Sequence, residues 1–355
     1  KSLKVELSAQ RSHNKGLEEY YVFNASGFEG VYNTVVDGTY FMSINAFGSA
    51  FKKPRKTGNM SGELFESFMR MRPSIAKRCS ENENRAEDGY GLTSQYVMMP
   101  AFVGAYIGIN SNNIWTDLLP PVKFMRPNWR VTFSGLSNIQ GLKDYVRNIE
   151  FSHSYTAKYT VGQYQTNLDW VSPGKDGEHI RDLQGNYLPK YTVSTISISE
   201  QLNPLIQVSA TLINNMTVSV GVNKQRNISL SLSNNQITET YSGDWNLSLG
   251  YRFDNLPLIF GHSEDAKQFN NDLNLTLALS QRDTYTILRR IEEMSNELAS
   301  GTKTTNIKVS ADYAFNRRFS MEFYYDQAIS KPYVSNSYPT SNVNVGVSFQ
   351  LSLSE

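Results

Sequence analysis

Few side chains of this sequence could carry catalysis or hold a metal ion. No two histidines of the chain have the spacing of metal ligands. His153 alternates with Phe151 and Tyr155 on the apolar side of an expected strand, which favours packing between strands over acid–base chemistry. The sequence contains four histidines: His13, His153, His179 and His262.

The other reactive groups also favour structural interpretations. Cys79 follows Lys77 and Arg78, which could lower the pKa of its thiol, but no partner is identifiable and we interpret it as a lone thiol in a loop. Arg289–Arg290 and Glu292–Glu293 have the composition of a solvated loop. No glycine-rich phosphate loop follows a strand and opens a helix. We predict no catalytic, cofactor-binding or metal-binding residue, no cofactor and no enzymatic activity, and we discount three sequons that alternating Asn and Ser produce: Asn227, Asn246 and Asn274.

Composition narrows the class of protein. The 355 residues include 34 Lys and Arg and 33 Asp and Glu, so the net charge is close to zero. A chain with so little net positive charge has no overall electrostatic attraction for nucleic acid. The longest apolar run, Val97–Ile107, is about half the length of a transmembrane helix, and one cysteine excludes an internal disulfide framework. Lys1 begins an alternating segment with no signal-peptide pattern. We therefore expect a mature, processed or partial chain.

The elements that position these groups have a period of two. Met216–Ser233 alternates apolar with polar residues, and only Lys224 and Arg226 interrupt the apolar series. The pattern returns after the Asn234–Asn235 turn, with Glu239 on the apolar series near the expected tip, where exposure costs little. Eighteen residues span about 60 Å, whereas a membrane crossing needs about 9–11 residues and soluble strands average five or six. Strands of this length favour a transmembrane sheet.

About eleven strands are predicted in total. We keep Thr195–Leu212 as one strand across Pro204 because the alternation survives it, and we expect Tyr285–Lys303 to be a hairpin tip. Since single-chain bacterial barrels have even strand numbers, eleven indicates part of a larger barrel. The other predicted strands are Leu3–Arg11, Tyr40–Phe51, Trp129–Leu136, Ile149–Gln163, Thr238–Phe253, Asp272–Ser280, Thr305–Phe315, Phe319–Tyr325 and Val343–Leu353.

The predicted fold is all-β, a section of a transmembrane antiparallel β-barrel wall that includes residues 1–355. Its apolar series faces lipid, and its Thr, Ser, Asn and Gly series faces a hydrated lumen. A soluble β-sandwich or β-solenoid is the alternative, although no fixed repeat supports a solenoid.

Residues 52–127 interrupt the alternation and predict a partly helical insert between strands. Glu63–Arg72 has helical spacing and should end at Pro73, and Ser94 could cap a second helix that runs through Tyr106. The insert could lie in the lumen, at the rim or against a partner.

An ordered series of segments is similar to one known family. The resemblance runs from about Phe23 to the end of the chain, through Asp88–Gln95, Pro100–Phe102, Asn128–Leu136, Phe151–Tyr155, Ser197–Gln201, Pro204–Ile206, Arg226–Asn234, Leu249–Phe253, Asn271–Leu275 and Ser337–Asn342. In this order they resemble the C-terminal portion of the SprA (Sov) family, the outer-membrane translocons of the type 9 secretion (gliding motility) system of Bacteroidetes.

The resemblance implies a very large barrel, roughly 36-stranded, of which this chain would be the last third or less. It also implies export of folded cargo proteins with C-terminal signals from the periplasm to the cell surface. The implied partners are the N-terminal part of the barrel, a PorV-like barrel at a lateral opening, a periplasmic Plug protein, the cargo and the lipid bilayer, and nucleic acid is not among them. The family has no catalytic residues to transfer. Two other hypotheses stay open, a porin or TonB-dependent-like transporter for small solutes and a soluble adhesion domain.

Overall fold

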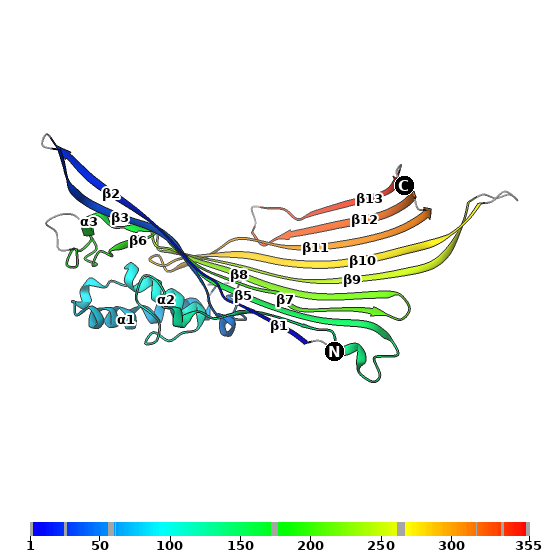
Figure 1. Cartoon of the computed structure of the whole chain (residues 1–355), viewed down its shortest axis with the longest axis horizontal. Coiled ribbons are helices and arrows are strands. Elements are labelled where there is room, and N and C mark those ends of the chain that lie inside the picture. The colour runs from blue at the N-terminus through cyan, green and yellow to red at the C-terminus, as the bar shows by residue number, and fades with distance from the viewer. Residues whose placement is uncertain are drawn as a thin grey trace.

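The computed structural model describes residues 3–24, 27–55, 60, 62–171, 177–260, 267–316, 318–334 and 337–352. Its main feature is one antiparallel sheet of thirteen strands, which forms an open, curved layer (Figure 1). The prediction of a mostly antiparallel all-β architecture is confirmed. The strands are β1 (Leu3–Ser8), β2 (Arg11–Asn24), β3 (Gly27–Ser43), β4 (Asn128–Phe133), β5 (Val146–Thr166), β6 (Tyr191–Val193), β7 (Thr195–Leu212), β8 (Met216–Ser231), β9 (Gln236–Phe260), β10 (Lys267–Arg290), β11 (Ser295–Asn316), β12 (Phe319–Pro332) and β13 (Thr340–Leu351).

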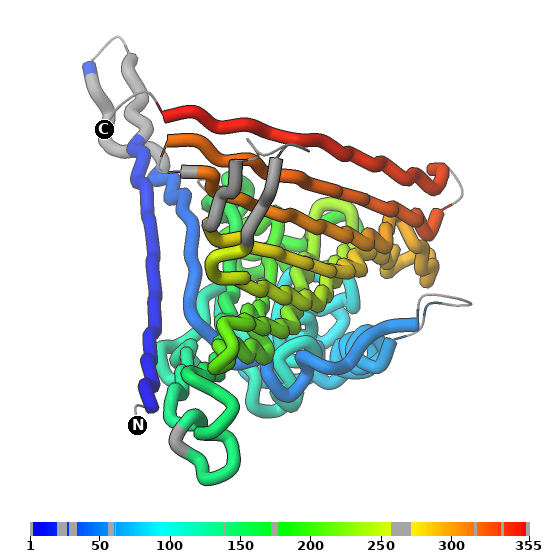
Figure 2. Tube along the Cα trace, turned by 90° about the vertical axis from the view of Figure 1, so that its right-hand side faces the viewer, coloured from blue at the N-terminus to red at the C-terminus, as the bar shows by residue number. Residues whose placement is uncertain are grey.

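The sheet keeps mostly chain order. Its path runs β1-β4-β5-β7 and then through consecutive strands to β13, and Figure 2 shows the strands from β7 (green) to β13 (red) following one another. The long strand β5 pairs with β4 along one half and with β3 along the other. Strands β1 and β13 lie at the two ends of this path. Among the described residues, β1 pairs only with β4 and β13 pairs only with β12. Consecutive antiparallel neighbours are what the hairpin turns predict.

The count of about eleven strands was too low. The prediction missed β2 and β6, and it placed a strand at Tyr40–Phe51, where β3 instead ends at Ser43. Almost all the described side chains from Arg11 to Glu19 in β2 are exposed, so neither face selects apolar residues and the strand leaves no alternation. The predicted end of the last strand, Leu353, lies outside the described residues.

Two other strand predictions have opposite outcomes. Strand β7 is continuous across Pro204, as predicted, because the proline sits where the register with β8 shifts between Leu202 and Ile206. The hairpin tip predicted at Tyr285–Lys303 is wrong, since β10 continues to Arg290 and β11 begins at Ser295. The tip is therefore only a four-residue turn.

The insert between β3 and β4 packs on one face of the sheet and contains α1 (Glu63–Glu83) and α2 (Gln95–Ile107). Both helices lie below the left-hand half of the strands in Figure 1. Their buried side chains form the main hydrophobic core against β3, β5, β7 and β8. Short 3-10 helices complete the insert and the loops: η1 (Phe47–Ser49), η2 (Glu87–Gly89), η3 (Val122–Phe124) and η4 (Leu136–Asn138), with the one-turn α3 (Leu168–Val171) before β6.

The two predicted helices exist with different ends. Helix α1 passes through Pro73, because Phe68 before it and Ile75 after it are fully buried and their packing offsets the hydrogen bond that a proline removes. Ser94 occupies the N-cap position of α2 but makes no capping hydrogen bond, and its buried hydroxyl has no partner in the described residues. No helix of the described chain is both long enough and apolar enough to span a membrane.

Candidate functional site

The sheet face that carries the insert changes from buried to exposed along β8. In β8, Arg226, Ile228 and Leu230 are at most 2% exposed because the insert covers them. Val220 and Val222, on the same face of the same strand, are 44% and 38% exposed. The pairing of β8 with β9 has no register shift, so both regions belong to one continuous face.

We call the uncovered region the apolar band. Its outermost strand, β13, shows Val347 at 51% and Phe349 at 63% exposure. From Trp245 to Phe253 in β9 the band is nine residues long, about 30 Å along the strand. The band consists of alternate residues within Ile206–Leu212, Met216–Val222, Trp245–Phe253, Leu273–Leu279, Ile307–Tyr313, Phe319–Tyr325 and Val343–Leu351, which the strand register places beside one another.

The opposite face of the same strands is polar and is tied by cross-strand hydrogen bonds. The Gln207 amide donates to Ser219 Oγ at 2.6 Å, and the Ser209 and Ser219 hydroxyls are 3.0 Å apart. Ser242 and Thr284 pair at 2.9 Å between β9 and β10. We call this surface the polar face. These neutral pairs satisfy the side chains within the sheet and suit a hydrated surface with little net charge.

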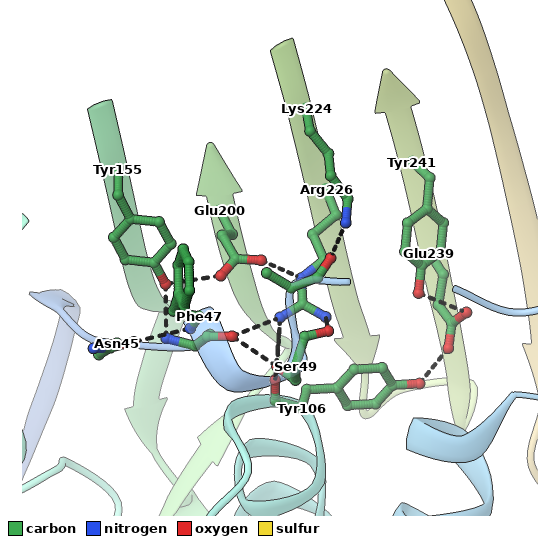
Figure 3. Close-up of polar contacts among 12 residues, drawn as sticks. Asn45, Phe47, Ser49, Tyr106, Tyr155, Glu200, Lys224, Arg226, Glu239 and Tyr241 are labelled. Atoms are coloured by element: carbon green, nitrogen blue, oxygen red, sulfur yellow. Dashed lines mark hydrogen bonds and ion pairs between the residues drawn. The ribbon is translucent and has the colours of Figure 1, made fainter. Parts of the chain in front are cut away.

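Under the insert, a buried ion pair joins the sheet to η1. Arg226 Nε donates to Glu200 Oε2 at 2.5 Å, and both side chains are almost fully buried. The rest of the guanidinium donates to Ser49 O at 3.0 Å, Ser49 Oγ at 2.6 Å and Ala46 O at 3.3 Å (Figure 3). The other Glu200 oxygen accepts the Tyr155 hydroxyl at 2.7 Å. The pair thus holds the backbone of the insert against the sheet.

A second buried pair lies one strand away. Arg289 of β10 contacts both oxygens of Glu239 in β9, at 2.8 and 3.0 Å, and both side chains are at most 1% exposed. Tyr106 of α2 donates its hydroxyl to the same carboxylate (Figure 3), and burial raises the pKa of this phenol well above its ordinary value. Arg289 also donates to Met60 O at 3.1 Å. This pair therefore anchors the segment before α1 and the end of α2.

A third cation completes what we call the sheet–insert junction: Glu200, Lys224, Arg226, Glu239 and Arg289, with Ser49 and Tyr106. The Lys224 ammonium donates to Ala50 O and lies 4.1 Å from the centre of the Phe51 ring. Two predictions are wrong here. Glu239 is buried, not exposed at a hairpin tip, and Arg289 is not in a solvated loop, because the insert covers the face on which both project.

Two of the described histidines have separate partners. His153 Nδ1 is 2.6 Å from Leu205 O in the neighbouring strand β7, which agrees with the predicted packing between strands. His13 Nε2 is 2.6 Å from the Tyr164 hydroxyl, and His262 lies outside the described residues. Within the described ranges no group of three or more His, Cys, Asp or Glu side chains could hold a metal ion.

Cys79 lies in helix α1, so its predicted loop position is wrong. The side chain is 3% exposed beside a cavity of about 340 Å³ between the two helices, whose lining includes Tyr90, Tyr96 and Tyr191. Burial raises the pKa of the thiol to about 11, and this outweighs the opposite effect of Arg78. The thiol stays protonated at neutral pH and is a poor nucleophile.

The comparisons with known proteins identify no family. No family model matches the sequence, and no curated protein is significantly similar to it. The functional argument therefore depends on the two faces of the sheet and on the junction.

The geometry of the junction suits a structural role, in which it holds the insert on the sheet. Each of its charges is met by an opposite charge or by backbone carbonyls, and all of its charged side chains except the half-buried Lys224 are closed off from solvent. Sequence reasoning missed it, although one signal was present. Five charged residues fall on otherwise apolar series of neighbouring strands: Glu200, Lys224, Arg226, Glu239 and Arg289. A charged side chain on such a face needs polar partners when the face is covered.

Proposed function

We propose that this chain forms a section of the wall of a large outer-membrane β-barrel that exports folded proteins to the cell surface. The apolar band is the observation that carries the proposal. A strand segment of about 30 Å, tilted as in membrane barrels, gives a band about 25 Å tall, the height of the lipid-facing belt of such barrels. Exposed Val, Leu and Phe side chains over that height are costly in water and favourable in lipid.

The polar face fits the other side of such a wall. Its Ser, Thr and Gln side chains pair with one another across strands, and several of its charged side chains lie in ion pairs, such as Arg252 with Asp272, so it offers a passing protein a hydrated surface. A conduit for folded proteins needs a surface of this kind. The choice of a protein-exporting barrel over a small-solute porin depends on the resemblance to the type 9 translocon family.

The same resemblance supplies the proposed partners and location. They are the remaining strands of the barrel, a PorV-like barrel at a lateral opening, a periplasmic Plug protein and folded cargo with C-terminal signals, in the outer membrane of a Bacteroidetes-like bacterium. The open sheet agrees with one section of a barrel wall, because a membrane barrel has to close so that the backbone groups at its strand edges are paired.

Purification of the native protein from outer membranes in mild detergent, followed by mass spectrometry of all co-eluting chains, tests the proposal. We expect one large particle that contains further barrel strands, a second, smaller barrel and a periplasmic protein. A lone chain or small homo-oligomer that conducts small solutes would contradict the export function. Recovery in the aqueous fraction without detergent would contradict the membrane wall itself.

A further inference from the structure

The border between the insert and the apolar band carries an unusual surface, which we call the rim patch: Phe47, Phe51 and Val122 with Lys52, Lys53, Lys123 and Arg126. Phe47, Phe51 and Val122 are 37%, 53% and 52% exposed. All four cations are exposed as well. Large apolar side chains and cations therefore occupy one strip of surface.

Contacts fix the rim patch beside the band. The Phe47 ring lies 5.8 Å from Trp129 of β4 and 5.5 Å from Tyr155 of β5, centre to centre. Trp129 pairs with Leu7 of β1, which is 67% exposed and continues the apolar face. Lys224, the first charged residue beyond the valines of β8, holds the Phe51 ring through a cation–π contact. The aromatic side chains thus sit where the apolar surface ends.

The loop of residues 119–127 lies along the end of β3, where the loop of residues 44–55 begins, and the charged residues of both loops are all basic. Arg126 N donates to Ser43 O at 3.1 Å, and the Tyr40 hydroxyl is 3.4 Å from Pro120 O. Residues 44–55 and 119–127 contain five cations and no acidic residue, whereas the whole chain is nearly neutral. The Glu63 carboxylate of α1 contacts one of the cations, Lys52, at 2.5 Å. The other three cations of the rim patch are Lys53, Lys123 and Arg126.

We infer that the rim patch rests in the headgroup layer of the membrane and binds phosphate-bearing lipid headgroups. Aromatic side chains prefer the membrane–water interface, and Lys and Arg beside an apolar surface attract anionic headgroups. The rim patch adjoins the apolar band, and its four exposed cations complement the negative charge of the headgroups. The inference depends on the proposed function, because it assumes that the band lies in lipid, and it assigns the insert to the lipid side of the wall.

Depth measurements separate the two claims. Single cysteines at Val122, Val345 and Leu183, in a Cys79→Ala background of the native complex, would carry spin labels in phosphatidylcholine–phosphatidylglycerol vesicles. Leu183 is fully exposed and serves as the water reference. We expect the label at residue 345 to be accessible to oxygen and protected from a nickel chelate, and the label at residue 122 to lie at intermediate depth.

The outcomes are distinct. A label at residue 122 that matches residue 183, while residue 345 is embedded, overturns the inference and leaves the proposed function intact. If the label at residue 345 is also in water, both fail. A label at residue 122 that neither oxygen nor the nickel chelate reaches indicates a protein cover, and this also overturns the inference.

A charge variant tests the headgroup contact. Lys52→Gln, Lys53→Gln, Lys123→Gln and Arg126→Gln together should lower the phosphatidylglycerol that co-purifies with the complex by at least about tenfold. The matched control neutralises four exposed cations of the polar face, Arg130, Lys158, Arg282 and Lys308, and should leave bound lipid unchanged. Equal lipid in both variants, with both complexes intact by size, would overturn the inference.

Discussion

At the scale of single residues, the buried charges of the sheet–insert junction are the most informative groups. A charge removed from water costs several kcal/mol unless its partners are well placed, and Arg226 has a carboxylate, two carbonyls and a hydroxyl within 3.3 Å. Loss of one partner leaves the other charge buried and unpaired in the interior. The junction is therefore sensitive to truncation in a way that surface pairs are not.

Arg226→Ala should lower the free energy of unfolding by about 3–5 kcal/mol, because it leaves Glu200 buried without its cation. Urea titration in lipid vesicles measures this change, and limited proteolysis should show that the insert becomes cleavable. The matched control is Arg282→Ala, whose guanidinium is exposed and 3.7 Å from Asp244, with an expected effect under about 1 kcal/mol. Equal effects of the two variants would contradict the anchoring role.

Cys79 should react slowly with thiol reagents. With a pKa of about 11, about one thiol in a thousand is ionised at pH 8, and the side chain is buried as well. Because burial raises this pKa in the folded state, the labelling rate should climb up to about pH 11 instead of levelling off near the ordinary value of about 8.5. Iodoacetamide labelling of the folded and urea-unfolded protein, with Leu183→Cys as an exposed reference, measures this. Fast labelling in the folded state would show that the thiol is accessible.

At the scale of elements, strand β8 performs two tasks on one face. The first half of β8 presents Val220 to the exterior, and the second half presents Arg226 to the insert. The change occurs at Lys224, level with the rim patch. A strand with this division needs a second element to cover the charged half, and the insert supplies that cover.

Val220→Arg should destabilise the protein in a bilayer by about 2–4 kcal/mol, since it places a charge near the middle of the band. Asn246→Arg, on the polar face of the adjacent strand β9, should change stability by less than about 1 kcal/mol. Urea unfolding in phosphatidylcholine vesicles gives both values. A soluble protein would tolerate both variants alike, because Val220 is already 44% exposed and an arginine would meet no steric barrier.

At the scale of the whole molecule, the sheet is open at both ends. Strand β13 is paired only with β12, and its outward apolar side chains are more than half exposed. Unpaired backbone groups at such an edge are unfavourable in lipid. The wall proposal therefore predicts that further strands pair at this edge.

Hydrogen exchange should reveal those missing neighbours. In the isolated chain in detergent, amides at alternate residues of β13 face the open edge and should exchange within seconds. In the native complex, the same amides should be protected. Uniform protection in the isolated chain would mean that β1 and β13 pair with each other, and the sheet would then be complete without another segment.

Alternation alone predicted the existence and order of β7 to β13, because a strand with one apolar and one polar face has to repeat every two residues, but it ended the β10 strand at Ser280 and began the β11 strand at Thr305, ten residues short in each case. The same reasoning failed for β2, whose described side chains are mostly exposed, and for the end of α1, where tertiary packing carries the helix past Pro73. The run of charged residues around Arg290 was interpreted as a solvated loop, so the predicted turn was longer than the observed one.

The sequence by itself determined the all-β architecture, the two unlike faces and the presence of a partly helical insert, since these follow from local patterning. Only the tertiary structure decided where the insert lies. A regular hairpin continued from the Thr211–Thr217 pair would place Glu200 opposite Ile228, but the shift between Leu202 and Ile206 brings it opposite Arg226. That shift pairs the charges, and the paired charges hold the insert on the apolar face. No local pattern encodes it, because its stability comes from residues far apart in the chain.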